Sequence, residues 1–168
     1  MSGRAGRRRR GTGQLIRPAR TGDSQALCEL WRAIDELHSA LAPKFFRAAP
    51  RTTDEWRRLL GAPQVAVLVD EHETAGAVTG AVLVRIYDTP ADPQMVPERR
   101  GYVDGLVVAP AHRRRGVGRR LMDAAAAWAK SQGGAQLVLT VWAGNDAARA
   151  FYHCLGYDVL SEVMTKPL

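Results

Sequence analysis

The sequence is poor in cysteine and in long apolar runs. Cys28 and Cys154 are the only cysteines in 168 residues, and they form no Cys-x-x-Cys pair. No apolar stretch approaches the roughly 20 residues that a bilayer span requires, and no apolar leader follows the first arginines. We therefore expect a soluble, cytoplasmic protein without a membrane partner, whose two thiols are reduced and are not nucleophiles.

Several motifs of catalytic and nucleotide-binding proteins are also absent. No Gly-x-Ser-x-Gly segment supplies a hydrolase nucleophile. His72-Glu73 lacks the second histidine of a zinc protease helix, so no metal site is supported. The Walker sequence Gly-Lys-Ser/Thr does not occur, and Leu121 stands where a Rossmann fingerprint needs its third glycine. Hydrolase, metalloenzyme and NTPase functions are thereby left without support.

Charge is distributed unevenly along the chain. Of the formal net charge of +7, residues 1–13 carry five arginines and no acid, and the remainder carries +2. Arginine and glycine with almost no apolar surface predict a disordered Arg-rich tail over residues 1–13, followed by a single domain over residues 14–168. Such a tail binds nucleic acid only electrostatically and weakly, so a nucleic-acid-associated module is one alternative function, and a merely solvated tail is the other interpretation.

Hydrophobic periodicity after the tail predicts alternating strands and helices. Strands are expected at residues 14–18, 65–69, 77–86, 101–108, 137–142 and 157–164. Helices are expected at residues 27–41, 53–60, 117–130 and 146–154. A polar turn over residues 70–75 makes the second and third strands an antiparallel hairpin, whereas the strand, helix and strand within residues 101–142 require a parallel pair. The sheet should therefore be mixed.

The most informative segment follows the fourth expected strand. Residues 113–118, Arg-Arg-Arg-Gly-Val-Gly, stand between an apolar run and an alanine-rich helical stretch. Glycines let the backbone N–H groups of the first helical turn approach an anion closely, and arginines supply charge-assisted donors. The sequence therefore predicts a diphosphate site. The guanidinium donors expected around it are Arg113, Arg114, Arg115, Arg119 and Arg120.

This Arg-x-x-Gly-x-Gly pattern resembles the signature of the GNAT family of acyl-CoA-dependent N-acetyltransferases. Two other segments are similar to motifs of that family: the strand 102–108 with Pro110 after it, and Asn145, which lies seven residues before Tyr152. The resemblance covers residues 14–168. It implies an α/β fold with a central mixed, mostly antiparallel sheet, flanking helices and a splay between the fourth and fifth strands.

The resemblance implies acetyl-CoA as the cosubstrate. In the family, backbone groups of the fourth strand pair with the pantetheine arm, and an N–H group, here of Val107 or Val108, polarises the acyl carbonyl. For Asn145, capping of the following helix is the alternative role. The implied cofactor contacts are Leu106, Val107, Val108, Arg113, Arg114, Arg115, Gly116, Val117, Gly118, Arg119, Asn145 and Tyr152.

Two residues stand at positions that the family uses for proton transfer. Tyr152 occupies the general-acid position, where a phenol that is protonated at neutral pH can reprotonate the departing thiolate; a packed aromatic ring is the alternative. Asp104 stands where many members carry a carboxylate that accepts the amine proton directly or through water; an ordinary strand-edge charge is the alternative. Thr140 replaces the glutamate of relatives that acetylate protein N-termini, which argues against that type of substrate.

The expected function is acetyl transfer from acetyl-CoA to a primary amine by direct attack in a ternary complex, without a metal. A non-catalytic acyl-CoA sensor is the alternative from another class, and an enzyme for longer acyl-CoA is a second. The amine, a small molecule or a peptide, is expected between the first two helices, the 88–100 loop and the sheet. Four acids on the first two helices are candidates to attract it, although for any one of them an ordinary helix-face charge is the favoured interpretation: Asp35, Glu36, Asp54 and Glu55. A homodimer is left open, because dimers are frequent in the family.

Overall fold

A five-stranded sheet in the order β1-β2-β3-β4-β5 forms the centre of the structure, a computed structural model that describes residues 14–47, 49–72 and 76–166. The strands are β1 (Gln14–Pro18), β2 (Val65–His72), β3 (Val78–Asp88), β4 (Arg99–Val108) and β5 (Gln136–Leu139). β1 to β4 pair antiparallel, and β5 pairs parallel with β4. The prediction of a mixed, mostly antiparallel sheet is confirmed.

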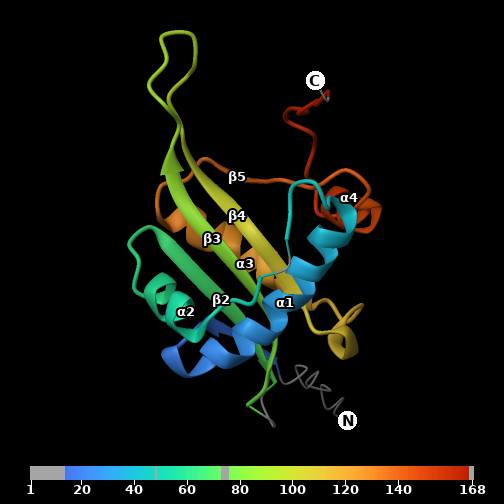
Figure 1. Cartoon of the computed structure of the whole chain (residues 1–168). Helices are drawn as coiled ribbons and strands as arrows, with labels where there is room; N and C mark the ends of the chain where they lie inside the picture. The colour runs from blue at the N-terminus through green and yellow to red at the C-terminus, as the bar shows by residue number, and fades with distance from the viewer. Residues whose placement is uncertain (1–13, 48, 73–75, 167–168) are drawn as a thin grey trace, which may run out of the picture.

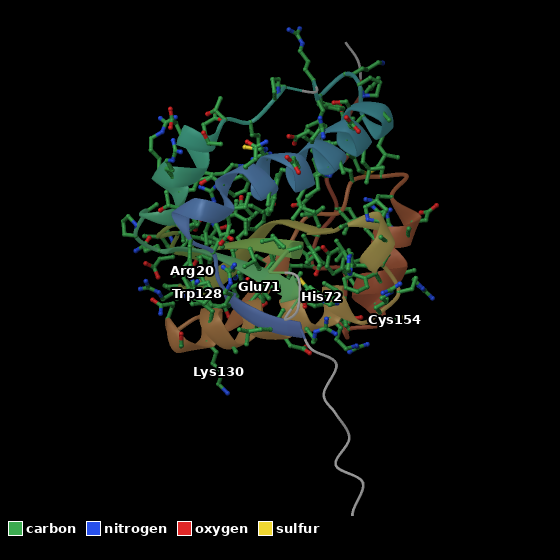
Figure 2. The ribbon with its side chains drawn as sticks, turned by 90° about the horizontal axis from the view of Figure 1, so that it is seen from below. Arg20, Glu71, His72, Trp128, Lys130 and Cys154 are labelled. Atoms are coloured by element: carbon green, nitrogen blue, oxygen red, sulfur yellow. The ribbon has the colours of Figure 1, made fainter. Side chains whose placement is uncertain are left out.

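Helices cover both faces of this sheet (Figures 1 and 2). They are α1 (Ser24–Leu41), α2 (Thr53–Leu60), α3 (Val117–Ser131) and α4 (Asp146–His153). Seen edge-on in Figure 2, α1 and α2 lie on one side of the sheet and α3 on the other, with Lys130 pointing away from the sheet. Within the described ranges, none of these helices combines the length and the apolar character needed to cross a bilayer.

The face beneath α1 and α2 is packed by large apolar side chains. Trp31 of α1 and Trp56 of α2 are fully buried and meet edge-to-face, with their ring centroids 4.6 Å apart. α2 is fixed at its start by a capping box, in which Thr52 and Glu55 satisfy each other's backbone N–H groups. The position of both helices on this face therefore follows from their apolar stripes and from one local cap.

The opposite face is covered by α3, whose small residues allow it to lie close to the sheet. Leu121, Met122 and Ala125 are buried against the valines of β3 and β4. A Cβ added at Gly101 of β4 would lie only 2.7 Å from the Cβ of Ala129. The glycine in the strand and the alanine in the helix therefore permit this close approach.

Two expectations about strands are wrong. β5 ends at Leu139 instead of residue 142, and the strand expected at 157–164 is a coil that leaves α4 (Figure 1). Val159, Leu160, Val163 and Met164 are exposed along this coil. A local apolar pattern favours a strand, but a strand also needs a neighbouring ladder, and the described chain provides none for this segment. The Arg-rich tail expected at residues 1–13 lies outside the described residues.

Candidate functional site

The distinctive feature of the sheet is that the hydrogen-bonded pairing between β4 and β5 stops about halfway along β4. The parallel pairing runs only from Arg100 opposite Gln136 to Val103 opposite Leu139. At the same point β4 contains a bulge, because Val103 and Gly105 pair with consecutive residues of β3 and Asp104 has no opposite residue. Beyond the bulge, no described strand pairs with the outer side of β4. We call this opening beside residues 105–108 the split.

Alternate residues of β4 present their backbone to the split. The Ala109 N–H donates to the Thr79 carbonyl at 2.9 Å, so Ala109 faces β3. Since residues of an antiparallel strand alternate in direction, Val107 also faces β3, whereas Leu106 and Val108 point their N–H and C=O groups into the split. An extended ligand lying in the split would meet the backbone of these two residues.

Apolar side chains border the split on two sides. On the α1 side, Phe46 meets Trp142 edge-to-face, with 4.6 Å between ring centroids. On the other side α4 packs against the first turn of α3, where a Cβ added at Gly118 would lie 3.1 Å from the Phe151 ring and 3.9 Å from Leu106. The end of α1 lies close to the segment before α4, since a Cβ added at Gly144 would lie 3.6 Å from Leu41 Cδ2 (Figure 1). The segments that flank the split thus come from three separate parts of the chain.

A cavity of about 270 Å³ lies between α1 and the end of β4. It is lined by four residues of α1, among which Glu29 is the only charged one, and by Val78 and residues 107–110. The wall is therefore mostly alkyl, which suits the methylene-rich part of an extended ligand better than its charged part.

The loop from β4 to α3 has the geometry of an anion site. Gly116, the N-cap of α3, has φ 78°, and Arg114 also has a positive φ of 61°. The Gly116 carbonyl accepts the first helical hydrogen bond, from the Arg120 N–H at 3.1 Å. The three preceding N–H groups, of Val117, Gly118 and Arg119, therefore have no partner within the helix and point out of its N-terminus. Val117 contributes only its backbone, because its side chain is buried.

Two of the predicted arginines fasten neighbouring segments together. Arg113 Nε donates to the Val108 carbonyl at 3.1 Å and so ties the loop to the end of β4. Arg119 Nη2 donates to the Cys154 carbonyl at 3.2 Å and so ties α3 to the end of α4. Both keep further N–H groups at the mouth of the loop.

The remaining three arginines point in different directions. Arg114 and Arg115 are exposed, and within the described ranges their side chains form no hydrogen bond or ion pair. Arg120, in contrast, turns toward the sheet, where its Nη2 donates to Asp70 at 2.9 Å. The geometry therefore leaves the exposed guanidinium groups of Arg114 and Arg115 available on the loop, whereas Arg120 binds a buried acid.

Asn145 and Tyr152 lie at opposite ends of α4. The Asn145 side chain accepts from the Ala148 N–H at 3.1 Å, so its capping role is present. The Tyr152 ring packs between Phe151 and Tyr157, at centroid distances of 5.1 and 5.7 Å. Burial, helped by the nearby Tyr157, raises the pKa of Tyr152 to about 12, so the phenol keeps its proton throughout the neutral range.

Asp104 lies at the bulge where the split begins, and its carboxylate has a charged partner. It forms an ion pair with Arg85 of β3, on the face covered by α1. On the same strand, the Tyr102 hydroxyl lies 2.9 Å from Thr140 Oγ1 and bridges β4 to the segment after β5. Sequence patterns did not indicate Arg85, because an arginine within a strand carries no motif and its partner is 19 residues away.

Three of the four acids expected to attract the amine already have partners. Asp35 pairs with Arg51 at 3.0 Å. On α2, Asp54 pairs with Arg57 at 2.6 Å, and Glu55 is the capping-box carboxylate of the helix. Arginine partners offset the charges of Asp35 and Asp54, and the attraction of the amine by these acids stays a prediction.

His38 lies on α1 near the aromatic border of the split. Its ring centroid is 4.9 Å from that of Phe46. Desolvation lowers the pKa of His38, with Asp35 opposing and Arg51 reinforcing that shift, so the imidazole is neutral near pH 7.

An interrupted sheet next to a glycine-started, arginine-rich helix N-terminus is a geometry suited to an extended ligand with an anionic end. The acetyltransferase (GNAT) family model matches residues 31–157. The chain belongs to the GNAT acetyltransferase family. Membership implies an acyl-CoA cosubstrate, and the implied diphosphate and pantetheine fit the helix N-terminus and the split.

Individual relatives agree with this assignment. Mycothiol acetyltransferase of Clavibacter sepedonicus is 40% identical over 97 residues, which are 54% of this chain and 30% of that protein, so the chain spans less than a third of this relative. A mutant of the BH1408 protein from Bacillus halodurans superposes with a TM-score of 0.86 at 26% identity, covering 92% of this chain and 99% of that one.

A more distant likeness concerns the fold alone. An aminoglycoside 6′-N-acetyltransferase from Acinetobacter baumannii superposes with a TM-score of 0.71 at 17% identity, covering 93% of this chain and 98% of that one. The architecture is therefore shared almost end to end with proteins whose sequences have diverged widely.

Proposed function

We propose that the protein transfers an acetyl group from acetyl-CoA to a primary amine by direct attack within a ternary complex. The observation that carries the proposal is the split beside Leu106 and Val108, which lies next to the helix N-terminus at Gly116. A single ligand with a diphosphate and an amide-containing arm matches both features.

The proposed reaction needs one base, one oxyanion donor and one acid. The amine nitrogen attacks the thioester carbonyl carbon, its proton passes to Asp104 directly or through a water, and an N–H facing the split holds the oxyanion. We assign that donor to Val108 in preference to Val107, whose N–H faces β3. As the carbon–sulfur bond breaks, Tyr152 gives its proton to the thiolate.

The acceptor is proposed to be a small-molecule amine. The relatives named as mycothiol and aminoglycoside acetyltransferases act on small molecules, as their names state. The carboxylates of Asp35 and Asp54 are already paired with arginines, so they are less available to attract a polycation, and we favour an acceptor with few amines.

A thiol-release assay with acetyl-CoA and a panel of small amines tests the proposal. We expect CoA to raise the melting temperature and at least one amine to release thiol above background. A thermal shift with no turnover for any amine, protein N-terminus or lysine peptide would favour an acyl-CoA sensor. The absence of any effect of CoA would contradict both functions.

A further inference from the structure

Asp70 of β2 is a charged side chain at a place where the sequence indicated a turn. Its side chain is completely inaccessible to solvent. Thr79 Oγ1 donates to one carboxylate oxygen, Oδ2, and Arg120 Nη2 donates to the other, Oδ1, at 2.9 Å. A buried carboxylate is stable only when its charge and its lone pairs are satisfied, so these partners are necessary for the strand to hold it.

Arg120 reaches from this buried acid to the proposed diphosphate loop. Its Nη1 donates to the Arg115 carbonyl at 3.3 Å, while Nη2 holds Asp70. The same Nη1 would lie 3.4 Å from a Cβ added at Gly116, so the guanidinium packs directly against the left-handed residue. One planar group thus connects the sheet to the exit of the loop.

The entrance of the loop is connected to the same acid. Thr79, which donates to Asp70, accepts from the Ala109 N–H at 2.9 Å through its own carbonyl. Ala109 is the first residue after β4, where the loop begins. The network around Asp70 therefore fixes both ends of the segment 109–116, although Asp70 itself touches neither the split nor the mouth of the loop.

We propose that Asp70 and Arg120 are positioning residues, which hold the loop in the conformation that directs its N–H groups at the diphosphate. The inference rests on the proposed use of acyl-CoA. Position 120 needs a forked donor, because its guanidinium donates to Asp70 and to the Arg115 carbonyl at the same time. A lysine ammonium at position 120 is a point donor that satisfies the buried charge but does not span both partners.

Arg120→Lys separates positioning from folding, and Asp70→Asn provides a second variant without a buried unpaired charge. We expect the dissociation constant for CoA to rise about tenfold in both, which corresponds to about 1.4 kcal/mol. Binding of S-acetylpantetheine, which has no diphosphate, should change less than twofold. Amide hydrogen exchange of unliganded protein should quicken in residues 113–119 and remain unchanged in β2 and β3.

Arg17→Lys is a matched control. Arg17 also donates to two carboxylates, of Asp23 and Glu71, and is only 10% exposed, but it lies on β1 away from the loop. We expect it to lower the melting temperature without changing CoA affinity.

Two results would overturn the positioning role. One is a folded Arg120→Lys variant whose CoA affinity and hydrogen exchange are unchanged, and the other is an equal loss of affinity for CoA and for S-acetylpantetheine. If wild-type protein failed to bind CoA, the proposed function would fail, and the exchange experiment would still decide whether Arg120 orders the loop.

Discussion

Tyr152 illustrates how packing prepares a single residue for a chemical role. Its ring is held between two aromatic neighbours, and burial raises its pKa to about 12. A phenol with this pKa stays protonated at every pH at which the protein is expected to work. It is also a weaker acid than a free tyrosine, so in the proposed mechanism proton transfer to the thiolate must be driven by the charge that develops on sulfur.

Replacement of Tyr152 by Phe should reduce kcat by about 100-fold or more, the usual contribution of a positioned acid. The ring and its packing remain, so the dissociation constant for CoA should stay within a factor of about two. Steady-state kinetics with the best amine of the panel, together with calorimetry for CoA, would measure both. Tyr157→Phe is the control, because Tyr157 is a neighbouring, half-buried phenol that should not donate to the thiolate.

Asp104→Asn tests whether this carboxylate is the base or only the partner of Arg85. If it accepts the amine proton, the variant should lose about 100-fold or more in kcat/KM and the acidic limb of its pH profile should disappear. Arg85→Met removes the ion pair and leaves the carboxylate, so it should keep most of the activity. Equal losses in the two variants would show that the ion pair, and not proton transfer, is what matters.

At the scale of elements, local patterns predicted most of the structure. The apolar stripes of α1 and α3 and the β-branched runs of β2 to β4 fall within two or three residues of their predicted bounds, because burial on one face is recorded locally in the sequence. The early end of β5 was not predictable in this way. It coincides with the bulge at Asp104 in another strand, where the register between β3 and β4 shifts.

The residues of the candidate site also fall into two groups, those that local sequence patterns indicate and those that depend on distant partners. Gly116 and Asn145 were found because turn and cap chemistry is encoded by a few adjacent residues. Asp70 was missed, since an aspartate followed by three polar residues is typical of a turn, whereas its strand continues to His72. The partner that permits its burial is Arg120, fifty residues later, and no local pattern records such a pairing.

Gly101 tests how closely α3 must approach the sheet. A Cβ at this residue would lie 2.7 Å from Ala129 and 2.8 Å from Leu137, so Gly101→Ala should force α3 or β5 outward. We expect the free energy of unfolding to fall by about 1–3 kcal/mol in urea denaturation, as for other overpacked cores. Gly22→Ala is the control, because its new methyl group has no atom within 4 Å and should change stability little.

At the scale of the whole molecule, the proposed chemistry draws on segments from most of the chain. The sheet face under α1 and α2 carries Arg85 and Asp104, whereas the proposed diphosphate loop lies at the start of α3 on the other face. The split is the opening in the sheet that connects the two faces.

The ion-pair cluster of Arg17 gives the molecule a defined response to acid. Hydrogen bonds from Arg17 hold the pKa values of Asp23 and Glu71 below their ordinary values. A carboxyl group whose pKa is lower in the folded than in the unfolded protein stabilises the fold fully above its unfolded pKa, near 4. That stability is lost as the pH falls through the folded pKa.

Arg17→Met should therefore lower the melting temperature at pH 7 and flatten its decline between about pH 5 and pH 2. Calorimetry across this range would measure the change, with the exposed pair variant Arg57→Met as control. Parallel wild-type and Arg17→Met curves would show that the cluster makes no pH-dependent contribution, because a lost packing contact alone shifts the melting temperature equally at every pH.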